Sequence, residues 1–213
     1  IKIEAKDITL DKKNFTSIFE NEVVIKTEDN NTIESDYLEY NKKKGLLKLK
    51  NNITANDVKN NVIKTDRAEY NEKEKIFLSI GETEIITSEK YILKGADIKV
   101  DNKKNIISSK NQTLLKDPDG NQIYLENFEF NINSNIFKSI GFVKIQDKIN
   151  NIYEFSQIYI DTKKKEILGT DIKAFLNQED FKVDQRNKPR VFANSIKIEK
   201  NSSSFNKSIF TLC

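Results

Sequence analysis

The sequence predicts an all-β protein built from stacked repeats, and three observations support that prediction. A short motif returns every thirty residues, apolar and polar side chains alternate within each copy, and turn-forming residues recur at fixed places. Alternation at a period of two is typical of strands with one buried face. A fixed repeat of this length is typical of stacked architectures, and no stretch shows a helical period.

The repeated motif is a short strand that ends in Asp or Asn. Its first copy is KDITLD at 6–11, and a seventh copy at 194–199 follows the sixth after thirty-eight residues. Because the repeat continues along the chain, we expect one domain over 1–213, with 177–190 as an extended connection before the last repeat. The six regularly spaced closing residues are Asp11, Asn41, Asn71, Asp101, Asn131 and Asp161.

Apolar residues form columns when the copies are aligned. The residues three and one positions before the closing Asp or Asn are mostly apolar, which predicts a strand with one buried face. An upstream apolar column, from Ile3 to Tyr153, has the opposite parity, so we expect a bulge or bend in each repeat. Two more columns follow the turn: Leu47, Phe77, Ile107, Phe137 and Ile167, then Ile25, Ala55, Ile85, Leu115, Ile145 and Phe175.

A second turn follows the closing residue by ten positions in each copy. Its residues all tolerate a positive φ, which explains why they interchange there. They are Asn21, Asn51, Gly81, Asn111, Gly141 and Asp171.

The composition argues against catalysis. The chain has no His and one Cys, so it offers no imidazole for a nucleophile or a metal. Carboxylate pairs such as Asp36 with Glu39 fall in polar columns, where they are expected to face solvent. The 36 basic and 33 acidic residues are interspersed, which argues against a nucleic-acid surface. We therefore expect no enzyme, no cofactor and no metal site.

The apolar columns have two interpretations. They close into an ordinary sandwich core, or they leave a trough for a lipid, whose burial contributes about 0.8 kcal/mol for each methylene. In the second case we expect the columns before the first turn to line the groove, without deciding which column faces inward. These residues are Leu38, Tyr40, Tyr70, Ile98, Val100, Phe128, Phe130, Ile158 and Ile160.

The first copy has no preceding repeat to cover it. We therefore expect an exposed edge that accepts a strand from another protein. Its expected contact residues are Ile1, Ile3, Ile8, Thr9 and Leu10.

The repeated unit, as in AEYNEKEKIFLSIGETEI at 68–85, resembles the OstA-like repeat of the lipopolysaccharide-transport proteins LptA, LptC and LptD. The ending FTLC at 210–213 looks like the close of the N-terminal domain of LptD, before its outer-membrane barrel. This resemblance implies an antiparallel β-jellyroll, also called a β-taco, that is open along one side. It also implies that acyl chains of lipopolysaccharide move along the interior.

The same resemblance implies a place and partners. The domain would lie on the periplasmic side of a Gram-negative outer membrane, receive lipopolysaccharide from LptA at its first edge, and meet LptE through a barrel that follows it. Cys213 would join an interdomain disulfide.

The alternatives are an LptA or LptC ectodomain, and a parallel β-helix adhesin or passenger segment. The basic residues Lys182, Arg186, Lys188 and Arg190 are either a solvated loop or contacts for lipid phosphates.

Overall fold

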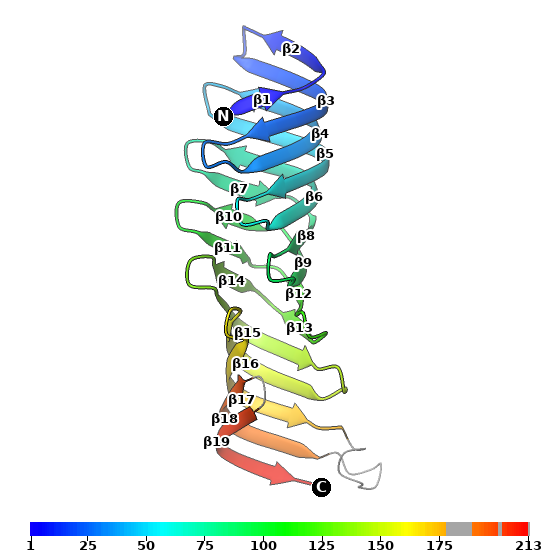
Figure 1. Ribbon diagram of the computed structural model, residues 1–213, viewed down its shortest axis with the longest axis vertical. Coiled ribbons are helices and arrows are strands. Elements are labelled where there is room, and N and C mark those ends of the chain that lie inside the picture. Colours follow the sequence, from blue (N-terminus) through cyan, green and yellow to red (C-terminus); the bar gives the residue numbers. More distant parts are fainter. Residues whose placement is uncertain (178–188, 200–201, 213) are drawn as a thin grey trace. The chain divides into compact units, whose positions relative to one another are not determined.

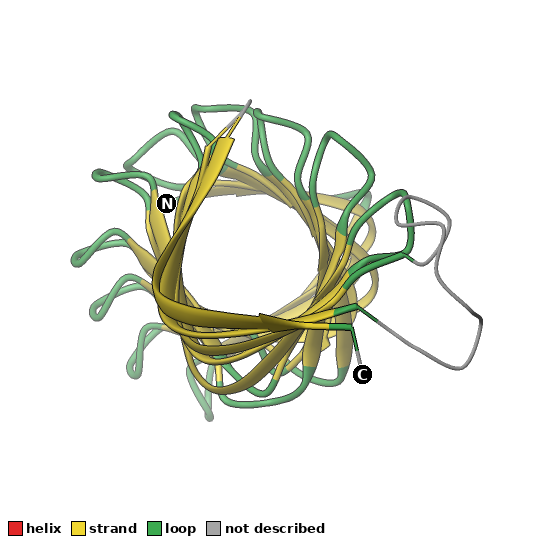
Figure 2. Ribbon diagram, turned by 90° about the horizontal axis from the view of Figure 1, so that it is seen from below, coloured by secondary structure: helices red, strands yellow, loops and turns green. Residues whose placement is uncertain are grey.

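The computed structural model describes residues 1–177, 189–199 and 202–212. These residues form strands and turns without a helix, which confirms the all-β prediction (Figure 2). The chain divides into two compact units, Ile1–Ser109 and Lys110–Cys213. The single domain over 1–213 stays a prediction, and most of the expected connection at 177–190 lies outside the described residues.

The first unit contains β1 to β11 (Figure 1). Its longest strands follow one another directly in the chain. The strands are β1 (Lys2–Glu4), β2 (Asp7–Asp11), β3 (Thr16–Lys26), β4 (Thr32–Asn41), β5 (Leu46–Asn56), β6 (Val62–Asn71), β7 (Ile76–Ser79), β8 (Glu82–Ile86), β9 (Ile92–Ala96), β10 (Lys99–Asp101) and β11 (Ile106–Ser109).

The second unit contains β12 to β19. The strands are β12 (Thr113–Lys116), β13 (Gln122–Leu125), β14 (Phe128–Asn131), β15 (Ile136–Gln146), β16 (Ile152–Asp161), β17 (Glu166–Phe175), β18 (Arg190–Glu199) and β19 (Ser202–Thr211).

Strand pairing within each unit is antiparallel. In the first unit β3, β4, β5 and β6 pair in succession, and β1 and β2 both pair with β3. In the second unit β15, β16, β17, β18 and β19 pair in succession. Antiparallel ladders over the described residues rule out the parallel β-helix interpretation.

The irregularity expected within each repeat is present in the first, second and fifth repeats, where the parity of the apolar columns changes. The ladder shifts register between Glu20 and Val23, between Lys50 and Ile53, and between Ile140 and Val143. Five of the six residues predicted to tolerate a positive φ adopt one; Asn111 does not. The five are Asn21, Asn51, Gly81, Gly141 and Asp171.

The closing Asp or Asn folds the first turn by local hydrogen bonds. Asp11 Oδ1 accepts from the backbone N–H groups of Lys13 and Asn14 at 3.0 and 3.1 Å. Asn71 and Asp161 do the same in their own repeats. Short polar side chains that bond the backbone two or three residues ahead favour such turns, so the motif ends its strand there.

One column differs from the sequence prediction. In the sixth repeat we expected Phe175 to continue the column of Ile145, but Ala174 takes that place. Ile145 and Ala174 are both cross-strand neighbours of Tyr153. Ala174 is buried, whereas Phe175 is half-buried. The spacing from the closing Asp161 is thus one residue shorter here than in the other repeats.

Candidate functional site

The nine predicted groove residues lie on the inward face of the sheet. Both columns face inward, because residues two apart in a strand share a face. Tyr40 and Phe130 are half-buried and the others are buried. Cross-strand neighbours join them into a ladder; in the first unit it runs through Tyr40, Leu47, Tyr70, Phe77, Val100 and Ile107. In the second unit it runs through Phe130, Phe137, Ile160, Ile167 and Ile198.

The other half of each long strand supplies a second apolar wall, which the sequence prediction left out of the site. The strands curve around an interior, so both halves of a strand contribute to its lining (Figure 2). The upstream column and the column after the second turn are the signal that identifies this wall. In the first unit it runs through Ile3, Ile25, Ile33, Ala55, Ile63, Ile85 and Leu93.

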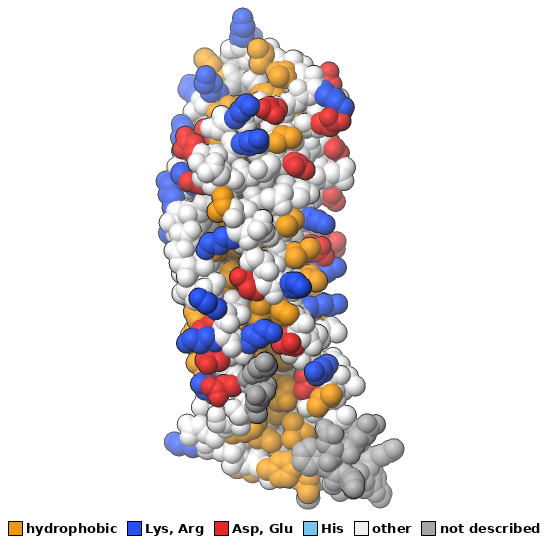
Figure 3. Space-filling view, viewed as in Figure 1, with side chains coloured by type: hydrophobic (Ala, Val, Ile, Leu, Met, Phe, Trp, Pro, Cys, Tyr) orange, Lys and Arg blue, Asp and Glu red, His pale blue; other side chains and the backbone are white. Residues whose placement is uncertain are grey.

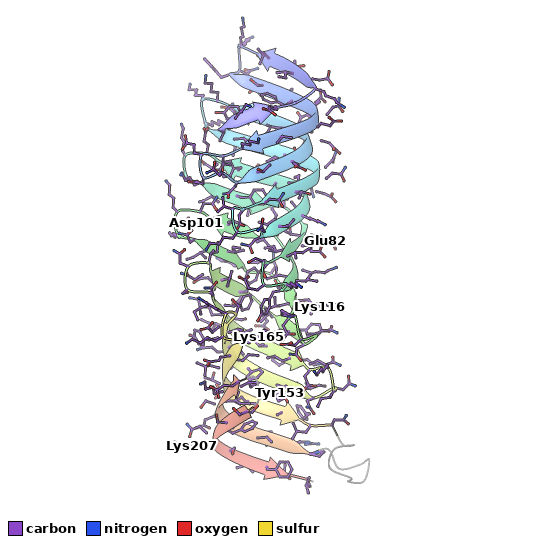
Figure 4. All side chains as sticks on the ribbon, in the orientation of Figure 1. Glu82, Asp101, Lys116, Tyr153, Lys165 and Lys207 are labelled. Atoms are coloured by element: carbon purple, nitrogen blue, oxygen red, sulfur yellow. The ribbon has the colours of Figure 1, made fainter. Side chains whose placement is uncertain are left out.

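Tyrosines lie where the apolar interior meets the polar turns. The Tyr40 hydroxyl donates to Glu72 Oε2 at 2.9 Å, and burial together with this bond raises the pKa of Tyr40 to about 12. Burial and the charge of Asp147 likewise raise the pKa of Tyr153, labelled in Figure 4, to about 12. A tyrosine with an apolar ring and a polar hydroxyl suits such a boundary.

Small hydroxyl residues occupy part of the interior near the bend of the strands. Ser79 Oγ accepts from the backbone N–H of Ile98 at 2.8 Å and from Thr83 Oγ1 at 2.7 Å. Ser139, at the equivalent place in the second unit, is 1% exposed, and its Oγ has no hydrogen-bond partner among the described residues. The interior is therefore apolar with local hydroxyl groups.

Within each unit the turns form two rows, which we call lips. Lip A consists of the turns after the closing Asp or Asn: 11–15, 41–45, 71–75 and 101–105 in the first unit, and 131–135 and 161–165 in the second. Lip B consists of the turns at the other ends of the strands: 27–31, 57–61 and 87–91 in the first unit, and 117–121 and 147–151 in the second.

Ion pairs connect the two lips within each unit. Lys75 Nζ of lip A lies 2.9 Å from Asp29 Oδ1 of lip B, and this contact raises the pKa of Lys75. In the second unit Nζ of Lys165, which is labelled in Figure 4, lies 3.3 Å from Asp119 Oδ2. The partners in both pairs are forty-six residues apart. All four side chains are partly exposed to water, so the lips are held together weakly.

The described residues show no arrangement for metal chemistry. No group of three or more His, Cys, Asp or Glu side chains among them is placed to hold a metal ion. In the same residues, no helix is long and apolar enough to span a membrane.

The apolar columns of the first strands are more exposed than those of the later repeats. Ile8 and Leu10 are 55% and 63% exposed, whereas Leu38, the equivalent of Ile8 one repeat later, is fully buried. Of the other predicted edge residues, Thr9 is exposed and Ile1 and Ile3 are half-buried. Apolar side chains also gather over β18 and β19, while charged side chains are spread over the visible face (Figure 3). Cys213, Lys182, Arg186 and Lys188 lie outside the described residues.

The fold and the site together define an antiparallel β protein with an apolar interior bordered by charged lips. No family model matches the chain, and no curated protein matches it. One similar solved structure is the crystal structure of LptH, the LptA homologous periplasmic component of the lipopolysaccharide transport device from Pseudomonas aeruginosa. The sequences are 12% identical, the match covers 79% of this chain and 80% of that chain, and the TM-score is 0.24.

Proposed function

We propose that this chain binds the acyl chains of lipopolysaccharide in its interior and guides them as part of a transport path, without acting as an enzyme. The observation that carries the proposal is the pair of apolar ladders, one through β4, β5, β6, β7, β10 and β11 of the first unit and one through β14 to β18 of the second, with tyrosines at the border of the interior. Burying one acyl chain of about twelve carbons stabilises a complex by roughly 10 kcal/mol, at ~0.8 kcal/mol per methylene. A long apolar lining therefore suits a lipid better than a polar ligand.

Within this proposal, the chain is the periplasmic domain of an outer-membrane translocon of the LptD kind. The support is the repeated OstA-like unit and the FTLC ending at 210–213. The domain would receive lipopolysaccharide from LptA at the edge formed by Ile1, Ile3, Ile8, Thr9 and Leu10. LptE would contact a barrel beyond Cys213, and Cys213 would form the interdomain disulfide. An LptA or LptC ectodomain is the alternative, and the sequence downstream of Cys213 distinguishes the two.

Photo-crosslinking tests the lipid path. A photoreactive residue at Tyr70 or Phe130 is expected to capture lipopolysaccharide, because both side chains lie on the inward ladder. Glu69 and Glu129 are matched controls, since each precedes its partner in the same strand and points to the opposite face. Capture from the two glutamate positions alone would overturn the proposed path.

A further inference from the structure

The two lips of the first unit carry opposite charge. Its lip A turns hold nine lysines and four carboxylates, a net charge of +5. Its lip B turns hold two lysines and four carboxylates, a net charge of −2. The whole chain has a net charge of only +3, so the basic character is concentrated along lip A.

The lysines of lip A are aligned by the repeat. Lys73 Nζ donates to the carbonyl oxygen of Lys43 at 3.0 Å, and Lys103 Nζ donates to that of Lys73 at 2.9 Å. Successive lip A turns are two strands apart, which places them about 9.5 Å from each other. An ammonium group has three N–H donors, so each of these lysines keeps donors for a further acceptor.

Lip A also borders the apolar interior. Tyr40 and Tyr70 lie on the inward ladder directly before two of its turns, and the Tyr40 hydroxyl bonds Glu72 of lip A. Lys75 is the lip A residue that meets lip B, through Asp29. An amphiphile with its chains in the interior has to place its head group at the lips, and lip A is the one that attracts an anion.

We propose that lip A of the first unit binds the phosphate groups of an acylated lipid, and that a phosphate takes the place of Asp29 on Lys75. This inference rests on the proposed function, because it requires acyl chains in the interior. A phosphate group carries more negative charge than a carboxylate and has three acceptor oxygens, so it competes well for a partly exposed lysine. Lys165 and Asp119 repeat the same contact in the second unit.

The experiment compares three probes on the full chain: diphosphorylated lipid A, the same acylated disaccharide without phosphate, and inorganic pyrophosphate. Binding is measured by isothermal titration calorimetry. Capture of the acyl chains is measured with the photoreactive residue at position 70. The variant K43A/K73A/K103A removes three aligned lysines of lip A. Its matched control is K48A/K64A/K99A, which removes three exposed lysines from strands of the same unit.

We expect the lip A triple variant to bind diphosphorylated lipid A about tenfold more weakly, with phosphate-free lipid and the control variant unaffected. Asp29→Asn is expected to strengthen binding of the phosphorylated lipid, because it frees Lys75. Equal affinity of the lip A variant and the control would overturn the inference, as would pyrophosphate binding as tightly as the phosphorylated lipid. If both lipids are captured at position 70 and bind with equal affinity, the phosphate inference is wrong and the proposed function is retained. If neither lipid is captured, the proposed function itself is contradicted.

Discussion

Ser79 and Ser139 occupy the same place in their repeats but differ in their hydrogen bonds. Ser79→Ala is expected to destabilise the protein by about 1–3 kcal/mol, because it leaves the buried N–H of Ile98 without its acceptor. Ser139→Ala is expected to be neutral or to stabilise by up to about 1 kcal/mol, because it removes a buried hydroxyl that has no partner among the described residues. Urea unfolding of both variants measures the difference. A loss from Ser139→Ala equal to that from Ser79→Ala would contradict this account.

The tyrosines beneath the lips predict a pH dependence. The folded pKa of Tyr40 and of Tyr153 is raised to about 12, whereas the pKa of an unfolded tyrosine lies near its ordinary value of 10.0. The unfolded chain therefore loses these protons first. The contribution of the two tyrosines to the free energy of unfolding is present in full below pH 10 and is lost as the pH rises from about 10 to about 12. Phenolate absorbance should show a late component that shrinks in Tyr40→Phe and Tyr153→Phe. A late component of unchanged size in both variants would contradict this account.

At the scale of the strand, Gly81 and Gly141 serve as the second turn of their repeats. Their φ values are +85° and +116°, which side chains rarely adopt, and a Cβ on Gly141 would lie 2.5 Å from Glu126 Oε2. Gly81→Ala is expected to destabilise by about 1 kcal/mol from backbone strain alone, and Gly141→Ala by more. Thermal unfolding compares the two. Equal effects would show that the flexible Glu126 side chain moves aside at no cost.

The elements show what local pattern predicts and where it fails. The closing Asp or Asn and the alternation of apolar residues predicted the strands and their first turns, because both act within a few residues. The prediction that Phe175 belongs to the inward column was wrong. One fewer residue separates Asp161 from that column in this repeat, so Ala174 faces inward there. The second wall was visible as columns, but its role in the site depends on the curvature of each strand, which a period of two does not describe.

At the scale of the whole molecule, the edge formed by the first strands is the proposed place for an added strand. Over the described residues, β2 pairs with β3 alone, and its Ile8 and Leu10 are members of inward columns left exposed. Because backbone N–H groups alternate in direction along a strand, one of Thr9 and Leu10 points its N–H to the open edge. Proline at that residue is expected to weaken binding to LptA without lowering the melting temperature.

Proline at the other residue of the pair removes a hydrogen bond to β3 and is expected to lower the melting temperature, so the two variants control each other. Interferometry with immobilised LptA measures binding, and thermal unfolding measures stability. Unchanged binding by both variants would count against strand addition at this edge.

The sequence by itself determined the repeat, the apolar columns and the turn chemistry. These properties arise from contacts between residues close in the chain or one repeat apart. Only the tertiary structure decided that both columns before the first turn share one interior with a second wall, and that Ser139 lacks the partners of Ser79. It also decided that Lys75 meets Asp29 and Lys165 meets Asp119. Those contacts join turns forty-six residues apart, and the curvature of the strands brings them together.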